Sequence, residues 1–183
     1  YDKFRQGFWI FTGDSNSQSK IAFTNDNFKN VEILLSGSQE TRSVISFPTK
    51  QGLIIATDTP LAQNYINFFD FQSQNVKKVQ KLPASVFYGT MVGEYFVVST
   101  AHEASIVNLT PFAHIFISKD GFDWKELYKQ RKDQWPNKFF QHGLFYFPSG
   151  INPGPYLYAG GQALQKDDEN LLIWNLNKLL ENY

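Results

Sequence analysis

The sequence predicts an all-β fold, a β-propeller of about four four-stranded blades that occupies residues 1–183 as one domain or as part of a larger propeller. The first observation is a repeat of short apolar segments whose first residues lie 45, 42 and 60 positions apart. These segments are Phe8–Asp14, Leu53–Thr59, Tyr95–Ala101 and Pro155–Gly161. Four-stranded units of about 40–50 residues are typical of propeller blades.

The second observation is that other β-like runs recur in the same order around each of these segments. A polar loop and a further strand follow in every unit, at Lys20–Thr24, Ile66–Phe71, His114–Ser118 and Leu171–Leu176. A more polar, half-exposed strand comes next at Val31–Leu35, Val76–Leu82 and Trp124–Tyr128. An inner strand precedes the last three units at Ser43–Phe47, Ser85–Val92 and Phe140–Phe147. A β-sandwich is the competing fold, but it has no reason to repeat one strand order.

The third observation is composition. Eighteen Phe, nine Tyr and four Trp supply large side chains for the space between blades. The chain has 17 basic residues (Lys plus Arg) and 17 acidic residues (Asp plus Glu). It therefore has no net positive charge that would favour nucleic acid as a partner. No apolar run approaches the ~18 residues of a membrane span, so none is expected. The absence of Cys excludes disulfides and thiolate metal sites.

Several other chemistries are not expected either. Gly160-Gly161 ends a strand and opens no helix, so no nucleotide cofactor is predicted. The three histidines, His102, His114 and His142, lack metal-ligand spacing, so no metal is predicted. Asn108-Leu109-Thr110 has the form of a glycosylation sequon, which is frequent by chance.

Two predicted hairpins carry a family resemblance. The segment Ser118–Trp124 (SKDGFDW) resembles the Asp-box, or BNR repeat, of the sialidase-like β-propellers, written S/T-x-D-x-G-x-T-W, and is one residue shorter. Thr24–Val31 (TNDNFKNV) keeps the Thr, the Asp and the length but has Phe for Gly and Val for Trp. Such a turn is stabilised by side-chain bonds to its own backbone. The resemblance implies that the box lies opposite the ligand site, so Asp26 and Asp120 are not expected to be catalytic.

The repeat also predicts where a ligand would bind. The loops between the second and third strands, together with the links between blades, are expected on one face, here called the upper face. Carboxylate, amide and guanidinium groups around one indole suit a sugar, since hydroxyls pair with the polar groups and a Trp stacks on the ring. An ordinary solvated loop surface is the alternative. The candidate ligand-binding residues are Asp14, Arg42, Asp58, His102, Glu103, Trp135 and His142.

The expected function is glycan recognition, with a relation to glycoside hydrolases as a further expectation and a glycan or protein ligand on the upper face. The alternative is a non-catalytic structural or protein-binding propeller, for example in a surface or virion assembly. Hydrolysis needs two carboxyl groups, which Asp14, Asp58 and Glu103 could supply. A sialidase would need three arginines around its substrate, and of the three present only Arg42 stands where an inner strand begins. Whether the chain is an enzyme is left open, and an extracellular, cell-surface or virion location is expected.

The strand count predicts that the ring is incomplete. Unit one begins with its second strand at Phe8, and unit four leaves only Asn177–Tyr183 for a fourth strand. The chain also starts at Tyr1 rather than Met. We therefore expect the sequence to be part of a longer polypeptide, or a neighbouring chain to supply the missing strands.

Overall fold

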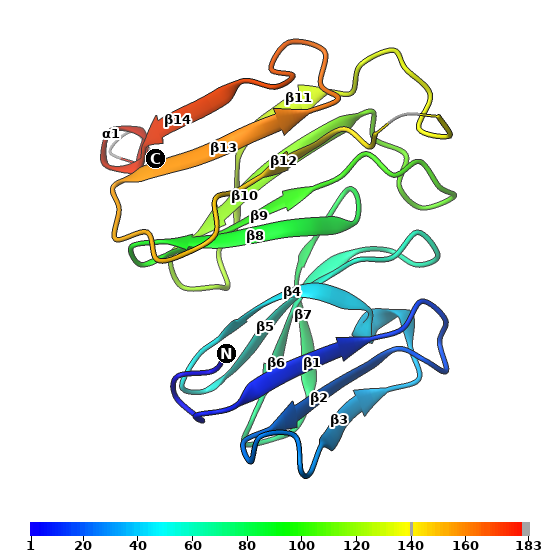
Figure 1. The fold of residues 1–183 in the computed structure, drawn as a ribbon, viewed down its shortest axis with the longest axis vertical. Coiled ribbons are helices and arrows are strands. Elements are labelled where there is room, and N and C mark those ends of the chain that lie inside the picture. Colours follow the sequence, from blue (N-terminus) through cyan, green and yellow to red (C-terminus); the bar gives the residue numbers. More distant parts are fainter. Residues whose placement is uncertain (140, 181–183) are drawn as a thin grey trace.

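A computed structural model of the chain describes residues 1–139 and 141–180, and its strands form four antiparallel sheets (Figure 1). The first sheet, blade 1, contains β1 (Phe8–Thr12), β2 (Lys20–Thr24) and β3 (Glu32–Ser36). Blade 2 contains β4 (Ser43–Pro48), β5 (Gly52–Thr57), β6 (Tyr65–Asp70) and β7 (Val76–Lys81). Blade 3 contains β8 (Val86–Val92), β9 (Tyr95–Thr100), β10 (Phe112–Ser118) and β11 (Lys125–Arg131). Blade 4 contains β12 (Leu144–Tyr146), β13 (Tyr156–Gln162) and β14 (Leu171–Asn175).

Within each blade the strands pair in sequence order, and the blades follow one another along the molecule in the same order (Figure 1). This arrangement confirms the predicted propeller and the four-stranded unit in blades 2 and 3. Blade 1 has three strands and lacks an inner one, as the strand count predicts. In blade 4 a short helix, α1 (Leu176–Leu180), follows β14 where a fourth strand was considered. The predicted inner strand of this blade begins at Phe140, which lies outside the described residues, and β12 itself is short.

The core lies between consecutive blades, because each inner sheet is apolar on both faces. Every residue of β5 is buried. Leu53 and Ile55 pack toward blade 1, whereas the alternate residues Ile54 and Ala56 pack toward blade 3. Strand periodicity of two produces this division, since successive side chains point to opposite faces. A third cluster around Phe145 joins blade 3 to blade 4.

The strand directions define two faces. The predicted upper face is the right-hand side of Figure 1. It carries the loops at 13–19, 58–64, 101–111 and 163–170 and the links at 37–42, 82–85, 132–139 and 141–143. The 3-10 helix η1 (Gln39–Thr41) lies in the first link. On the opposite, lower face are the turns β2–β3, β6–β7 and β10–β11. No helix among the described residues has the length and apolarity needed to cross a membrane.

The lower-face turns are built around carboxylates, as the Asp-box resemblance implies for two of them. Asp120 Oδ1 accepts hydrogen bonds from Ser118 Oγ (3.1 Å) and from the N–H groups of Phe122 and Asp123 (2.8 Å each). Gly121 takes a positive φ of 82°, which explains the glycine. Trp124 is buried and donates its indole N–H to Gly121 O (2.9 Å). Asp120 therefore stabilises the turn on the face opposite the candidate ligand site.

The same device appears in the other two turns. Asp26 accepts from Thr24 Oγ1 and from the Asn30 N–H, at 3.0 Å each. Asp70 accepts from the backbone N–H of Ser73 at 2.7 Å, a turn that the sequence pattern did not single out. Backbone N–H donors hold the pKa of Asp26, Asp70 and Asp120 below the ordinary value for an aspartate.

Candidate ligand site on the upper face

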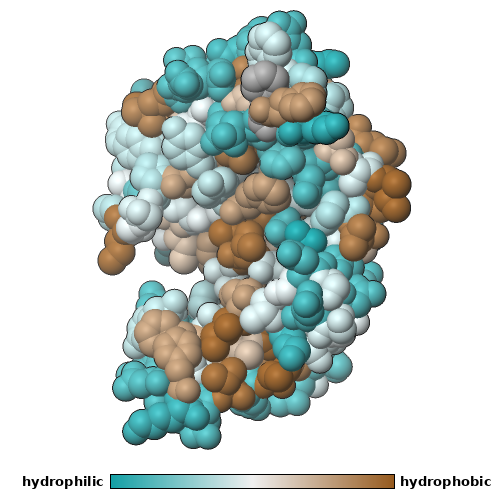
Figure 2. All heavy atoms as spheres, turned by 45° about the vertical axis from the view of Figure 1, so that its right-hand side comes forward, coloured by the Kyte–Doolittle hydropathy of each residue, from teal (hydrophilic) through white to brown (hydrophobic). Residues whose placement is uncertain are grey.

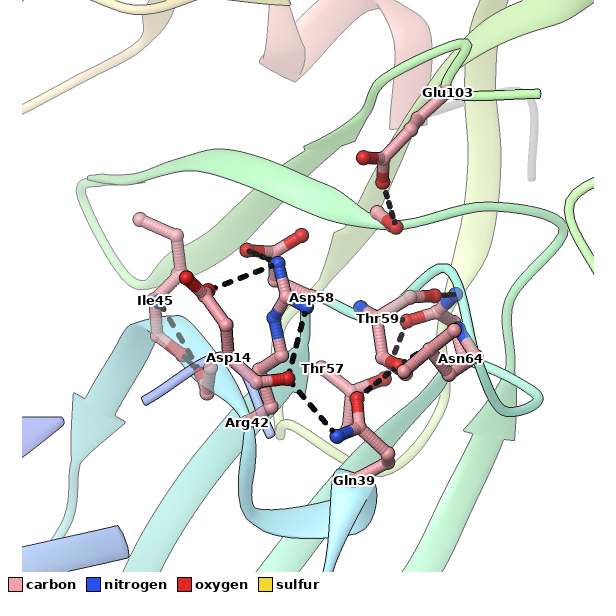
Figure 3. A network of polar contacts seen from close by, with 12 residues as sticks. Asp14, Gln39, Arg42, Ile45, Thr57, Asp58, Thr59, Asn64 and Glu103 are labelled. Carbon is pink, nitrogen blue, oxygen red and sulfur yellow. Dashed lines mark hydrogen bonds and ion pairs between the residues drawn. The ribbon is translucent and has the colours of Figure 1, made fainter. Parts of the chain in front are cut away.

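Arg42 brings the upper ends of blades 1 and 2 together. It follows η1 and immediately precedes the inner strand β4. Its Nη2 lies 3.4 Å from Asp14 Oδ1 and 3.8 Å from Asp58 Oδ2, so the guanidinium stands between two carboxylates (Figure 3). Asp14 follows β1 and Asp58 follows β5, the equivalent strand of the next blade. The repeat therefore places these two carboxylates at corresponding loop positions, as predicted.

Asp58 is the unusual member of this group. The residue is 9% exposed, and its Oδ1 is buried without a hydrogen-bond partner. Burial raises the pKa of Asp58 to about 6, with the nearby charges of Glu103 and Asp14 acting in the same direction and Arg42 opposing them. An unsatisfied buried carboxylate oxygen is costly, and shifted carboxyls of this kind occur preferentially at functional sites.

A chain of hydrogen bonds fixes the loop that carries Asp58. Gln39 donates from Nε2 to Asp14 O (3.2 Å) and accepts from Thr59 Oγ1 (2.5 Å). The Asn64 side chain accepts from the Thr59 N–H (3.1 Å) and donates back to Thr59 O (2.8 Å), which closes the loop on itself. Thr57 Oγ1 also donates to Asn64 Oδ1 (2.9 Å). The backbone on both sides of Asp58 is thus held by buried side chains (Figure 3).

The network continues into blade 3 and ends at Glu103. Asn64 Nδ2 donates to Asn108 Oδ1 (2.9 Å), and Asn108 Nδ2 donates to Ser85 Oγ (3.1 Å). Ser85 Oγ donates in turn to Glu103 Oε2 (3.0 Å). The upper face therefore holds three carboxyl groups: Asp14 and Asp58 flank the guanidinium of Arg42, and Glu103 lies at the other end of the network, near enough for its charge to act on Asp58. Such a set can accept hydrogen bonds from hydroxyl or amino groups, and its negative excess disfavours an anionic ligand.

His102 and His142 form a second group, which ties the loop after β9 to the link between blades 3 and 4. His102 Nδ1 lies 2.7 Å from Thr110 O. His142 Nδ1 lies 3.3 Å from His102 O, and Asn137 Nδ2 donates to the same carbonyl at 2.9 Å. Both imidazoles therefore have backbone contacts that order the loops around them.

Trp135 lies in the link between blades 3 and 4. The residue is 54% exposed, and its backbone N–H donates to Asp133 Oδ1 (2.9 Å). The buried Lys132 ammonium pairs with the same carboxylate and donates to Trp135 O. These residues, with Arg131, Gln134 and Gln165, line a pocket of about 350 Å³. The structure therefore divides the predicted set into three groups: Asp14, Arg42, Asp58 and Glu103; His102 and His142; and Trp135.

Sequence reasoning did not identify the buried amides that support the site. Gln39, Asn64 and Asn108 look like ordinary turn residues in the sequence, and their burial comes from neighbouring blades. Asn108 belongs to the sequon but is only 2% exposed, so its amide is not accessible to glycosylation in the folded chain. Among residues 1–139 and 141–180, no cluster of three or more His, Asp or Glu side chains is arranged to hold a metal ion.

Comparison with solved structures supports the fold. The chain is similar to the β-propeller domain of the Trilobed protease from Pyrococcus furiosus, described as having an open velcro topology, with a TM-score of 0.51 and 16% identity. The similarity covers 92% of this chain and 51% of the other, so the chain spans about half the length of that structure. No protein-family model and no curated protein matches the sequence. The likeness confirms a β-propeller and does not extend to membership of the Asp-box sialidase-like propellers.

Proposed function

We propose that the upper face recognises a glycan through Asp14, Arg42, Asp58 and Glu103. The observation that carries the proposal is the Asp58 carboxyl, which is buried, raised in pKa and unpaired at Oδ1 beside the Arg42 guanidinium. If this residue only helped to join two blades, we would expect a hydrogen-bond donor next to Asp58 Oδ1, or an amide in place of the carboxyl. Retaining it is consistent with a partner that supplies the missing hydrogen bond.

The charge balance narrows the class of glycan. This part of the upper face carries three carboxyl groups and one guanidinium, so an acidic sugar would be repelled while a neutral or amino sugar would not. Sugar hydroxyls donate to carboxylates and accept from the guanidinium. Glycans displayed on surfaces are accessible to a protein located outside the cell, on its surface or on a virion, and this is the location that the proposal entails.

A glycan array probed with the 183-residue chain tests the proposal. Wild type should bind neutral or amino-sugar glycans, and Asp58→Asn and Arg42→Gln should each weaken binding by about 5- to 150-fold, the range of a lost buried polar contact. Asp168→Asn is the matched control, because it makes the same chemical change on an exposed upper-face loop of blade 4. Binding of acidic glycans alone, or equal binding by all four proteins, would contradict the proposal.

A hydrolysis screen on the glycans that bind distinguishes recognition from catalysis. A carboxyl with a pKa of about 6 is suited to donate a proton to a leaving group, and Asp14 or Glu103 would be the second carboxylate. Product release by wild type that disappears in Asp58→Asn would assign a glycosidase. Binding without product release would assign recognition alone.

A protein ligand on the same face is the second candidate, and exposed aliphatic side chains favour it. Ile106 is 82% exposed and Leu109 is 81% exposed on the loop after β9, and Leu61 is also exposed on the loop after β5. Figure 2 brings this side of the molecule forward, with hydrophobic residues among hydrophilic ones. Sugar sites stack rings on aromatic rather than aliphatic groups. If a protein is the ligand, Ile106→Ser with Leu109→Ser should abolish its capture, whereas glycan binding should be unaffected.

A further inference from the structure

Thr110, His114 and Glu126 form a connected group of side chains on blade 3. Thr110 lies in the loop before β10, and His114 lies within that strand. Because side chains alternate along a strand, His114 shares a face with Phe116, which packs toward blade 2. Glu126 reaches the same face from the neighbouring strand β11. The group therefore lies inside the arc of blades, with blade 2 before it and blade 4 after it.

The imidazole of His114 joins the other two side chains through its two ring nitrogens. Nδ1 lies 2.7 Å from Glu126 Oε2, and Nε2 lies 3.2 Å from Thr110 Oγ1. An ionised carboxylate can only accept a hydrogen bond, so Nδ1 carries the proton of a neutral ring. Nε2 is then a bare acceptor, and the Thr110 hydroxyl donates to it.

Burial and neighbouring charges hold the group in this protonation state. Burial lowers the pKa of His114, with Lys129 acting in the same direction and Glu126 opposing them. Burial alone would raise the pKa of Glu126, but hydrogen bonds from His114 and from Lys129, whose Nζ lies 3.0 Å from Oε1, lower it. The rings of Phe112 and Phe116 contact the imidazole, with centroids 6.2 and 5.9 Å away. At neutral pH the imidazole is therefore neutral, and the carboxyl beside it is ionised.

The Thr110 oxygen keeps a lone pair with which it can attack an electrophile. A hydroxyl has one proton to donate and two lone pairs. The proton is directed to His114 Nε2, and one lone pair accepts a hydrogen bond from the Phe112 N–H at 3.2 Å. The second lone pair has no partner among residues 1–139 and 141–180, and Thr110 is partly exposed. The distances are those of a nucleophile beside a base that a third group orients.

We propose that Thr110 is a nucleophile that takes an acyl group from a carboxylic ester, with His114 as its base and Glu126 as the residue that positions the base. Thr110 Oγ1 forms a bond to the ester carbonyl carbon while its proton passes to His114 Nε2. The bond between that carbon and the ester oxygen then breaks, and the alcohol leaves with the proton from Nε2. His114 ends neutral, Thr110 carries the acyl group, and nothing is oxidised or reduced.

The composition of the group indicates which esters would react. It supplies one nucleophile and one base, so we expect esters of phenols, whose leaving groups need little protonation, to react and amides not to react. None of the three residues is among those proposed to bind a glycan. Acyl transfer and glycan binding can therefore fail separately.

Para-nitrophenyl acetate and the 183-residue chain test the reaction, with peptide mapping by mass spectrometry to locate the acetyl group. Wild type should carry acetyl on Thr110. Thr110→Val removes the hydroxyl with little change of shape and should carry none at that position, whereas Thr110→Ser should still react. His114→Gln should slow acetylation of Thr110 by about 100-fold or more, the contribution of a positioned base. Thr90→Val, at another partly exposed threonine, is the matched control and should react like wild type.

The pH dependence distinguishes a base from a contact that only supports the fold. Acetylation of Thr110 in wild type should decrease on acidification with a midpoint below about 6.5, because only neutral His114 can accept the proton. In Glu126→Gln the midpoint should move to lower pH, since Glu126 raises the pKa of His114. The rate at neutral pH should also decrease in this variant, because the ring is no longer held in one tautomer by a charge.

Three results would overturn the proposal. They are acetylation confined to other side chains in wild type, equal acetylation of Thr110 in wild type and His114→Gln, and a pH midpoint that Glu126→Gln leaves unchanged. Circular dichroism checks the fold of each variant. If His114→Gln does not fold, the pH dependence in wild type and the comparison of Thr110→Val with Thr110→Ser still decide.

Discussion

Asn64 Nδ2 donates a 2.9 Å hydrogen bond to Asn108 Oδ1, which joins the upper loops of blades 2 and 3 across 44 residues of sequence. Both amides are buried, and each has further partners, so neither side chain is free to turn toward solvent. Low dielectric surroundings strengthen such a bond and make the loss of one partner expensive. The pair therefore connects the loop beside Asp58 to the loop that carries Glu103.

Asn108→Ala is expected to destabilise the fold by about 1–3 kcal/mol, because it removes one buried hydrogen-bond partner from the Asn64 amide and one from the Ser85 hydroxyl. Urea unfolding measures the change. Asn16→Ala on an exposed upper loop should have an effect within about 0.5 kcal/mol and serves as the control. An equal midpoint for the two variants would show that the buried pair does not contribute to stability.

Asp120→Ala should lower stability by about 1–2 kcal/mol, since the carboxylate accepts two backbone N–H bonds and one hydroxyl bond in the β10–β11 turn. Ligand binding on the opposite face should not change. Asp123→Ala is the matched control, because Asp123 contributes its backbone N–H to the turn. Thermal unfolding of both variants decides the question, and a larger loss in Asp123→Ala would contradict this account of the turn.

The fold was predictable because each blade repeats the same strand order and its second strand is an apolar run. The segment that became β5 is apolar from Leu53 to Ala56, which is the pattern of a strand covered on both faces. The Ser118–Trp124 turn was predictable because its bonds are local, within five residues of Asp120. The helix α1 and the short β12 were not, since both lie in the incomplete last blade, where the repeat gives no register.

The candidate site was only partly predictable for a different reason. A repeat tells which face a loop occupies, so Asp14, Asp58 and Glu103 could be assigned to one face together. It does not give the distance of a residue from the inner strands, which is why Trp135 and the two histidines were grouped with the carboxylates. The Asn64–Asn108 contact depends on the packing of two blades and has no signature in either segment alone.

Protonation of His114 is expected to destabilise the protein as the pH falls below about 6.5, the ordinary histidine value. His114 is buried, and this burial lowers its pKa, although Glu126, 2.7 Å from Nδ1, opposes the shift. A folded-state pKa below the unfolded one means that the unfolded chain takes up the proton first, so stability rises with pH through this window. In His114→Gln the change of stability with pH should be smaller than in wild type. Denaturant midpoints from pH 5 to 7 test this, and a slope equal to wild type would refute it.

Asp58 should make the stability of the fold depend on pH in the opposite direction. Its folded-state pKa of about 6 lies above the ordinary aspartate value of 3.8, so the folded chain binds the proton more tightly than the unfolded chain. Stability contributed by this group is present at low pH and is lost as the pH rises from about 4 to 6, by no more than about 3 kcal/mol. Because His114 acts in part of the same range, the difference between wild type and a variant isolates the Asp58 contribution.

Asp58→Asn removes the titrating group while keeping the size of the side chain, so its stability relative to wild type should increase as the pH rises through that window. Asp168→Asn makes the same chemical change at an exposed residue and is the control variant. Urea unfolding at half-unit steps from pH 4 to 7 supplies both curves. If Asp58→Asn runs parallel to wild type, the carboxyl is not held with a raised pKa. If it instead loses stability as the pH rises, attraction to Arg42 outweighs the cost of burial.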